Sequence, residues 1–131
     1  MNSKQNGVEM PLIDARGLVE AIRAFADARD WAQFHSPKNL AMALTGEVGE
    51  LVEIFQWLTE DESRRATEDP ARAEQVRHEL ADVLIYLVRL SDVLGVDLDA
   101  AVREKLALNA RKYPVETSRG NNRKYSDRIS G

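Results

Sequence analysis

Two copies of an acidic pair stand in the middle of the sequence. Residues 47–50 read Glu-Val-Gly-Glu and residues 79–82 read Glu-Leu-Ala-Asp. On an α-helix, residues three positions apart lie on one face, one turn from each other. Two such helices packed face to face would gather four carboxylates, which repel strongly in a half-buried place unless a cation lies between them. The pattern therefore predicts a helical metal site with four ligands: Glu47, Glu50, Glu79 and Asp82.

The rest of the chain is predicted to be helical as well. Apolar residues recur at helical spacing near the N-terminus, and Ser36-Pro37 and Asp69-Pro70 are typical helix starts, with a capping residue followed by proline. Asp97 is a further N-cap, and Pro114 stops the helix that follows it. No stretch alternates with period two, so we expect an all-α, four-helix bundle. Its helices cover about residues 12–29, 36–58, 69–95 and 97–112, and the polar residues 59–69 form a loop, with room for one helical turn.

Composition and charge restrict the classes of function. We expect one helical domain over residues 12–114, a flexible leader at 1–11 and a basic, partly mobile tail at 115–131. Residues 111–131 hold six basic and two acidic residues, a net +4, which leaves −8 for the rest of a chain whose total is −4. An acidic body argues against broad nucleic-acid binding. The sequence has no cysteine and no apolar run of the roughly 20 residues that a membrane helix needs, and we expect neither a secretory signal nor a membrane partner but a cytoplasmic protein.

The position of the acidic residues around their helices favours a site over a solvated surface. Glu47 and Glu50 lie on the flank of an apolar stripe, beside Ile54 and Trp57, and the opposite face holds Glu53 and Gln56. In the later helix, Glu79 and Asp82 share a flank with Tyr86, next to the stripe of Leu80, Val83, Leu84 and Leu87. Carboxylates at the rim of a buried stripe are typical of a cleft between helices.

Ligand chemistry restricts the metal. A set made only of carboxylates favours Mg²⁺, with Mn²⁺ as a substitute, over zinc or copper. A di-iron bundle normally requires Glu-x-x-His, and neither His35 nor His78 stands three residues after a glutamate. Mg²⁺ commonly binds substrate phosphates, so hydrolysis of a phosphoanhydride is the chemistry that suits this site best.

The helix of residues 69–95 is apolar over most of its circumference from Leu80 to Leu94. A single layer of four helices leaves one face of each helix in water, so this helix requires further cover. Either it is the central helix of one domain or a second copy of the chain covers it. We favour the oligomer.

The sequence resembles a known family over about residues 18–125. Glu47-x-x-Glu50 and Glu79-x-x-Asp82, with 28 residues between them, look like the metal signature of the MazG-like all-α nucleoside triphosphate pyrophosphohydrolases. Further segments resemble the dCTP pyrophosphatase branch: 29–31 (Arg-Asp-Trp), 34–35 (Phe-His), 46–51 (Gly-Glu-Val-Gly-Glu-Leu), 55–57 (Phe-Gln-Trp), 82–87 (Asp-Val-Leu-Ile-Tyr-Leu), 113–114 (Tyr-Pro) and 123–125 (Arg-Lys-Tyr).

The resemblance implies a reaction and a set of roles. Such enzymes hydrolyse a nucleoside triphosphate, often dCTP or a modified pyrimidine deoxynucleotide, to the monophosphate and pyrophosphate with Mg²⁺, and the branch forms homotetramers. The four acidic residues would be the catalytic metal ligands. The implied substrate-binding residues are Trp31, His35, Trp57, Tyr86, Lys105, Asn109, Lys112 and Lys124. Animal members carry a histidine nine positions before the tryptophan of Arg-Asp-Trp, where this chain has Ile22, so their base selectivity does not carry over at that position.

From the residues alone, ordinary structural roles are alternatives to these substrate-binding roles. The tryptophans and Tyr86 suit core packing, His35 suits a structural hydrogen bond, and Lys105 with Asn109 suits a solvated helix face. The alternative for the whole chain is a catalytically inactive helical module that binds a nucleotide or a metal.

Overall fold

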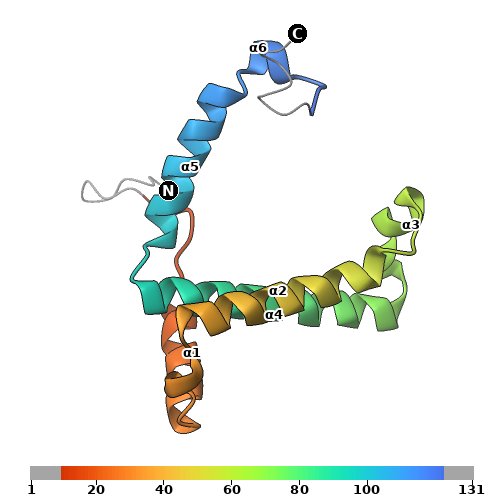
Figure 1. Ribbon diagram of the computed structural model, residues 1–131. Coiled ribbons are helices and arrows are strands. Elements are labelled where there is room, and N and C mark those ends of the chain that lie inside the picture. Colours follow the sequence, from red (N-terminus) through yellow and green to blue (C-terminus); the bar gives the residue numbers. More distant parts are fainter. Residues whose placement is uncertain (1–9, 123–131) are drawn as a thin grey trace. The chain divides into compact units, whose positions relative to one another are not determined.

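The computed structural model describes residues 10–122, and every regular element in that range is a helix. The all-α class is thereby confirmed. None of these helices is long and apolar enough to cross a membrane. The elements in Figure 1 are α1 (Arg16–Ala28), η2 (Ala32–Phe34), α2 (Pro37–Phe55), α3 (Glu60–Arg64), η3 (Ala66–Glu68), α4 (Pro70–Leu94), α5 (Leu98–Lys112) and α6 (Val115–Ser118).

The chain divides into two compact units. Within the described residues, one is formed by residues 15–96, which hold α1 to α4, and the other by residues 10–14 and 97–122, which include α5 and α6. The predicted domain over residues 12–114 spans both units, and its boundaries with the leader and the tail stay predictions. Residues 123–131, which include much of that tail, lie outside the described part of the chain.

In the second unit, the residues before α1 bind to α5. The backbone N–H groups of Leu12 and Ile13 donate to Oδ1 of Asp99, at 2.6 and 3.0 Å, and Arg103 Nη2 donates to the carbonyl oxygen of Met10 at 2.6 Å. The N–H of Ile13 is the main cause of a lowered pKa for Asp99. Our expected start of the first helix, near Leu12, is therefore wrong by about one turn: α1 begins at Arg16 because the preceding N–H groups bind a side chain.

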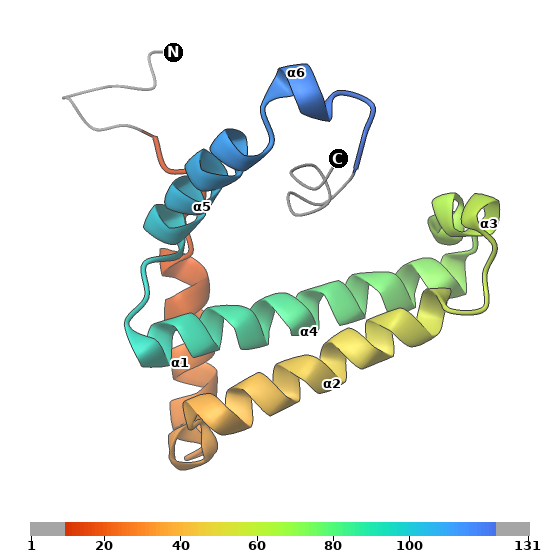
Figure 2. The ribbon, with the colours of Figure 1, turned by 45° about the horizontal axis from the view of Figure 1, so that its top comes forward.

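In the first unit, α2 and α4 lie side by side and α1 crosses them near the end of α4 (Figure 2). Local chemistry fixes both long helices as predicted. Ser36 Oγ accepts from the N–H of Asn39 at 3.2 Å with Pro37 in the first turn, and α4 ends at Gly95, whose φ of 67° suits glycine. The loop after α2 is more helical than expected, because Thr59 and Glu62 form a reciprocal capping box that starts α3.

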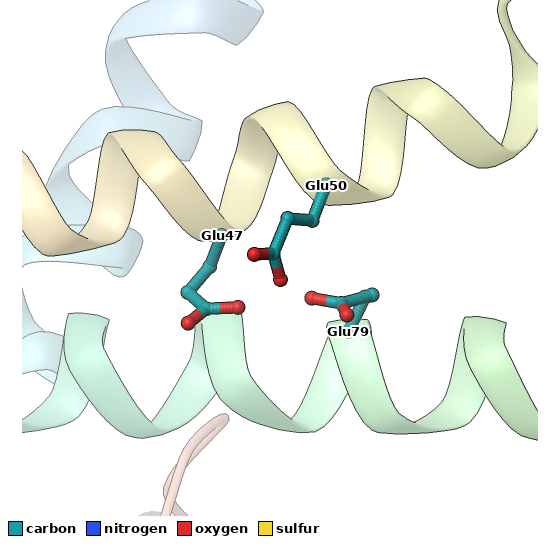
Figure 3. A group of neighbouring side chains, drawn as sticks. All are labelled: Glu47, Glu50 and Glu79. Atoms are coloured by element: carbon teal, nitrogen blue, oxygen red, sulfur yellow. The ribbon is translucent and has the colours of Figure 1, made fainter.

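The apolar stripe of α4 does not lie in the core of the single chain. Leu80, Leu84 and Leu87 are 53%, 49% and 41% exposed, although we expected this stripe to be buried. The reason is the rotation of α4, whose acidic flank faces α2 instead (Figure 3). The buried core is made of small and medium side chains: Ala26, Leu40, Ala66, Ala73, Val76 and Val88.

Because this core is small, truncation of its largest member is expected to be costly. Leu40 is 1% exposed, and replacing it with alanine should lower the free energy of unfolding by about 2–5 kcal/mol, since burial is lost and a cavity is left. Urea denaturation followed by circular dichroism measures the change. Met42→Ala, on the same helix but 64% exposed, is the control and should cost less than about 0.5 kcal/mol. Equal costs for the two variants would contradict this assignment of the core.

Candidate functional site

Three acidic side chains meet between α2 and α4. Glu47 and Glu50 extend from α2 and Glu79 from α4, and Figure 3 shows their carboxylates pointing toward one another across the space between the helices. One oxygen from each group lies within 4.8 Å of those from the other two. The three carboxylates come close together because Glu47 and Glu50 stand one turn apart on α2, which packs along α4.

Burial makes this cluster unfavourable without a cation. Glu47 and Glu79 are half-buried, and the Oε2 atom of each is enclosed with no hydrogen-bond partner among residues 10–122. Burial, and then the carboxylates of Glu79 and Glu50, raise the pKa of Glu47 to about 7. Burial also raises the pKa of Glu79. A divalent cation would satisfy the two enclosed oxygens and offset the repulsion, so this all-oxygen donor set fits a hard metal ion such as Mg²⁺.

The fourth predicted ligand, Asp82, lies close to this group without belonging to the tight trio. Its charge contributes to the raised pKa values of Glu47 and Glu79, and its side chain is half-buried. It stands one turn after Glu79 on α4 and lines the cavity next to the trio. Three of the four predicted ligands are thus gathered and the fourth lines the cavity; that they bind a metal stays a prediction.

The cavity measures about 380 Å³ and is mostly apolar. Leu18, Ile22 and Phe25 of α1 form one wall, and Ile85 of α4 contributes to the other. Three of the residues implied by the family resemblance also line it: Trp31, His35 and Tyr86. An apolar cavity with a few polar groups, open beside an acidic cluster, is the usual form of a site for an organic ligand.

Trp31 is held at the edge of this cavity by its neighbour. Its ring meets that of Phe25 edge to face, with centroids 5.6 Å apart, and the guanidinium of Arg29, the residue that follows α1, lies 3.7 Å from the centroid of the Phe25 ring. Asp30, with a left-handed φ of 55°, makes the turn that brings the tryptophan back toward α1. Trp31 keeps 43% of its surface exposed, so its ring remains available for contact.

One polar residue of the cavity, Arg89, was not predicted from the sequence. It is 8% exposed and lies on the face of α4 that also carries Asp82 and Tyr86, at spacings of seven and three residues. Its Nε atom donates to Nδ1 of His35 at 3.0 Å. The available signal was a single basic residue within the otherwise apolar run of residues 83–90.

The other predicted substrate contacts do not line this cavity. Trp57 follows the end of α2 and is 87% exposed. Lys105, Asn109 and Lys112 belong to α5 in the other unit, where Lys105 and Asn109 share a helix face as expected. Lys124 lies outside the described residues. The roles of these five residues stay predictions.

An all-α fold with three gathered carboxylates beside an apolar cavity defines a class of helical proteins suited to hold a divalent cation next to an organic ligand. Comparison with known proteins is more specific: the chain belongs to the MazG-like family, whose profile matches residues 43–127. This confirms the resemblance found in the sequence.

The chain is similar to curated and solved relatives that are named pyrophosphatases. It is 48% identical to human dCTP pyrophosphatase 1 and 50% identical to the bovine protein of that name, in each case over 79% of this chain and 61% of the relative. The chain thus spans somewhat less than two thirds of these relatives. A solved pyrophosphatase from Archaeoglobus fulgidus superposes with a TM-score of 0.70 at 45% identity, over 75% of this chain and 90% of that one.

Proposed function

We propose that the chain is a Mg²⁺-dependent nucleoside triphosphate pyrophosphohydrolase that converts dCTP, or a related pyrimidine deoxynucleotide, to the monophosphate and pyrophosphate. The observation that carries the proposal is the pair of enclosed, unpartnered carboxylate oxygens, on Glu47 and Glu79, beside a cavity of about 380 Å³. The names of the relatives agree with this reaction. Clearing unwanted triphosphates from the nucleotide pool is the role that follows.

We assign separate roles to the carboxylate cluster and to the apolar cavity. Glu47, Glu50 and Glu79, with Asp82 beside them, would hold Mg²⁺ or Mn²⁺, which neutralises phosphate charge and lowers the pKa of a bound water. Trp31 and Tyr86 would contact the base, and the apolar walls of α1 would exclude water from it. Asp82 lines the cavity close to the carboxylate trio, so one ligand would reach both. On the family resemblance alone, Lys105, Lys112 and Lys124 are proposed contacts of the triphosphate, and Asn109 is a proposed polar contact of the nucleotide.

We also propose that the chain assembles as a homotetramer. In support, Leu80, Leu84 and Leu87 form a continuous exposed stripe on α4, and Val48 and Val52 on α2 are 41% and 52% exposed. Apolar stripes of this kind are seldom left in water by a monomeric protein. Light scattering at micromolar concentration should give about four times the chain mass of 14.7 kDa. A cytoplasmic location is proposed as well, on the absence of cysteine in the sequence.

The activity is tested by pyrophosphate release from a panel of deoxynucleoside triphosphates. With Mg²⁺ we expect release from dCTP, and Glu50→Gln should lower it at least about 100-fold, because one of three gathered ligands is lost. Glu53→Gln is the matched control, since Glu53 is exposed on the same helix and outside the trio, and it should retain activity within about threefold. No release from any triphosphate by a folded protein would refute the proposal and leave the inactive binding module.

A further inference from the structure

Arg89 is a buried cation that has only part of its hydrogen-bonding capacity filled. Besides the bond from its Nε to His35, its Nη1 lies 3.5 Å from Oδ2 of Asp92, a long contact. Asp92 is engaged more closely by Arg23, which binds both of its oxygens, with Nε at 2.8 Å from Oδ2. The guanidinium has five N–H groups, and its Nη2 has no partner within residues 10–122. Arg89 lines the cavity, so the N–H groups that it does not use within the chain are accessible to a ligand there.

His35 adds a second donor to the same end of the cavity. Because its Nδ1 accepts the hydrogen bond from Arg89, the proton of the neutral ring is on Nε2, which is therefore a donor. Arg89 holds the ring in this tautomer. His35 and Arg89 both line the cavity, and they offer N–H groups to a ligand there.

The N–H donors of Arg89 and His35 lie far enough from the carboxylates for one ligand to extend between the two groups. Asp82 and Arg89 are seven residues apart on α4, about 10 Å along the helix axis at 1.5 Å per residue. Tyr86 lies between them on the same face, and the wall opposite is formed by apolar residues of α1. The cavity therefore presents an acidic end, an aromatic and apolar middle, and an end that carries only donors.

We propose that Arg89, supported by His35, determines base specificity by binding the adjacent acceptors O2 and N3 of a cytosine ring. The inference rests on the proposed function, because it assigns the base of the same substrate. A guanidinium donates two parallel hydrogen bonds to neighbouring acceptors, as it does to the O6 and N7 atoms of guanine in nucleic acids. Cytosine has such a pair in O2 and N3. Uracil and thymine keep O2 but carry a hydrogen on N3, which would face one donor of Arg89 and leave that donor unpaired.

The position of Ile22 agrees with this assignment. Ile22 lines the cavity from α1 with an apolar side chain, so it cannot donate a hydrogen bond to the base. The polar recognition in this chain is supplied from α4 instead. A site that hydrogen-bonds a ligand discriminates strongly against an analogue with the wrong pattern, because buried polar groups are left without partners.

The test uses nucleoside monophosphates, so that it does not depend on catalysis. Calorimetry on the full chain should show dCMP binding at least about tenfold more tightly than dUMP, which differ in the base edge that faces Arg89. In Arg89→Met, which keeps the length of the side chain without its N–H groups, the two affinities should become equal. Arg23→Met is the control: it breaks the other ion pair to Asp92, lies outside the cavity, and should leave the tenfold preference unchanged.

If Arg89 has only a structural role, Arg89→Met should weaken the binding of dCMP and of dUMP by the same factor. That outcome, or an absence of preference in the unmodified protein, overturns the proposal. Circular dichroism of each variant checks its fold, and Arg89→Lys, which keeps the charge but not the planar fork, should retain less than half of the preference. Pyrophosphate release from dCTP and dUTP is measured in parallel. Release without selectivity would refute the specificity proposal alone, whereas selective binding without release would refute only the proposed function.

Discussion

Glu47→Gln is expected to stabilise the metal-free protein while it abolishes Mg²⁺-dependent pyrophosphate release. The two effects have one origin: the carboxylate of Glu47 is held in a half-buried place, close to those of Glu50 and Glu79. An uncharged amide relieves the repulsion when no cation is present, but it removes a ligand when one is. We expect activity to fall at least about 100-fold, since the trio loses both a charge and a donor oxygen.

The gain in stability should depend on pH with a definite sign. The pKa of Glu47 is raised from 4.5 to about 7 in the folded protein, so the folded state holds its proton more tightly than the unfolded chain does. The contribution of this group to stability is complete below pH 4.5 and is lost as the pH rises through 7. The metal-free protein should therefore become less stable over that range. Glu47→Gln removes the part of this slope that Glu47 contributes, while Glu79 keeps its own raised pKa. The advantage of the variant should be on the order of 1 kcal/mol at pH 8 and smaller at pH 5, because Glu47 is only half-buried.

Urea denaturation at pH 5 and pH 8, with EDTA or with Mg²⁺, measures both parts of this prediction. In the unmodified protein Mg²⁺ should raise the unfolding midpoint at pH 8, because it binds the folded state only. In Glu47→Gln that response should nearly vanish. Glu53→Gln, exposed on the same helix, should behave as the unmodified protein does. If Glu47→Gln is less stable than the unmodified protein at pH 8 in EDTA, the three carboxylates do not destabilise the metal-free fold, and the prediction is wrong.

The parts of the fold set by local chemistry could be predicted from the sequence. The start of α2 at Ser36-Pro37 and the end of α4 at Gly95 each depend on one or two residues, and both were located correctly. The start of α1 was not, because it depends on the bonds that Leu12 and Ile13 make to Asp99, more than 80 residues later. A contact at that separation leaves no periodic trace in the sequence.

The candidate site also has a part that could be predicted from the sequence and a part that could not. The trio was predictable because both acidic pairs have helical spacing and flank an apolar stripe. The rotation of α4 was not, since both the acidic flank and the stripe of Leu80 and Leu84 have enough apolar surface to face a partner helix. Arg89 was not predicted as a site residue because a single charged residue in an apolar run forms no spacing pattern. Its role emerges only from its approach to His35, which comes from a different segment.

The exposed stripe on α4 leads to a second prediction of large effect: Leu84→Glu should dissociate the proposed tetramer. Leu84 lies at the centre of the stripe, four residues after Leu80 and three before Leu87, and is 49% exposed in the single chain. If a second copy covers the stripe, the new carboxylate is buried without a partner at each symmetric contact, which costs several kcal/mol per interface. Light scattering should then show a mass well below that of the parent.

The same exposure predicts that the dissociated chain keeps its helices. Because Leu84 does not lie in the core of the single chain, the far-ultraviolet circular dichroism of Leu84→Glu should match that of the parent, so a lower mass cannot be ascribed to unfolding. Val115→Glu makes the same chemical change at a residue of α6 that is 72% exposed and lies outside the stripe, and it should leave the mass unchanged. A Leu84→Glu protein with the parental mass would show that no second copy covers this face. The exposed leucines of α4 would then need another explanation, because a stripe of this kind in water promotes non-specific association.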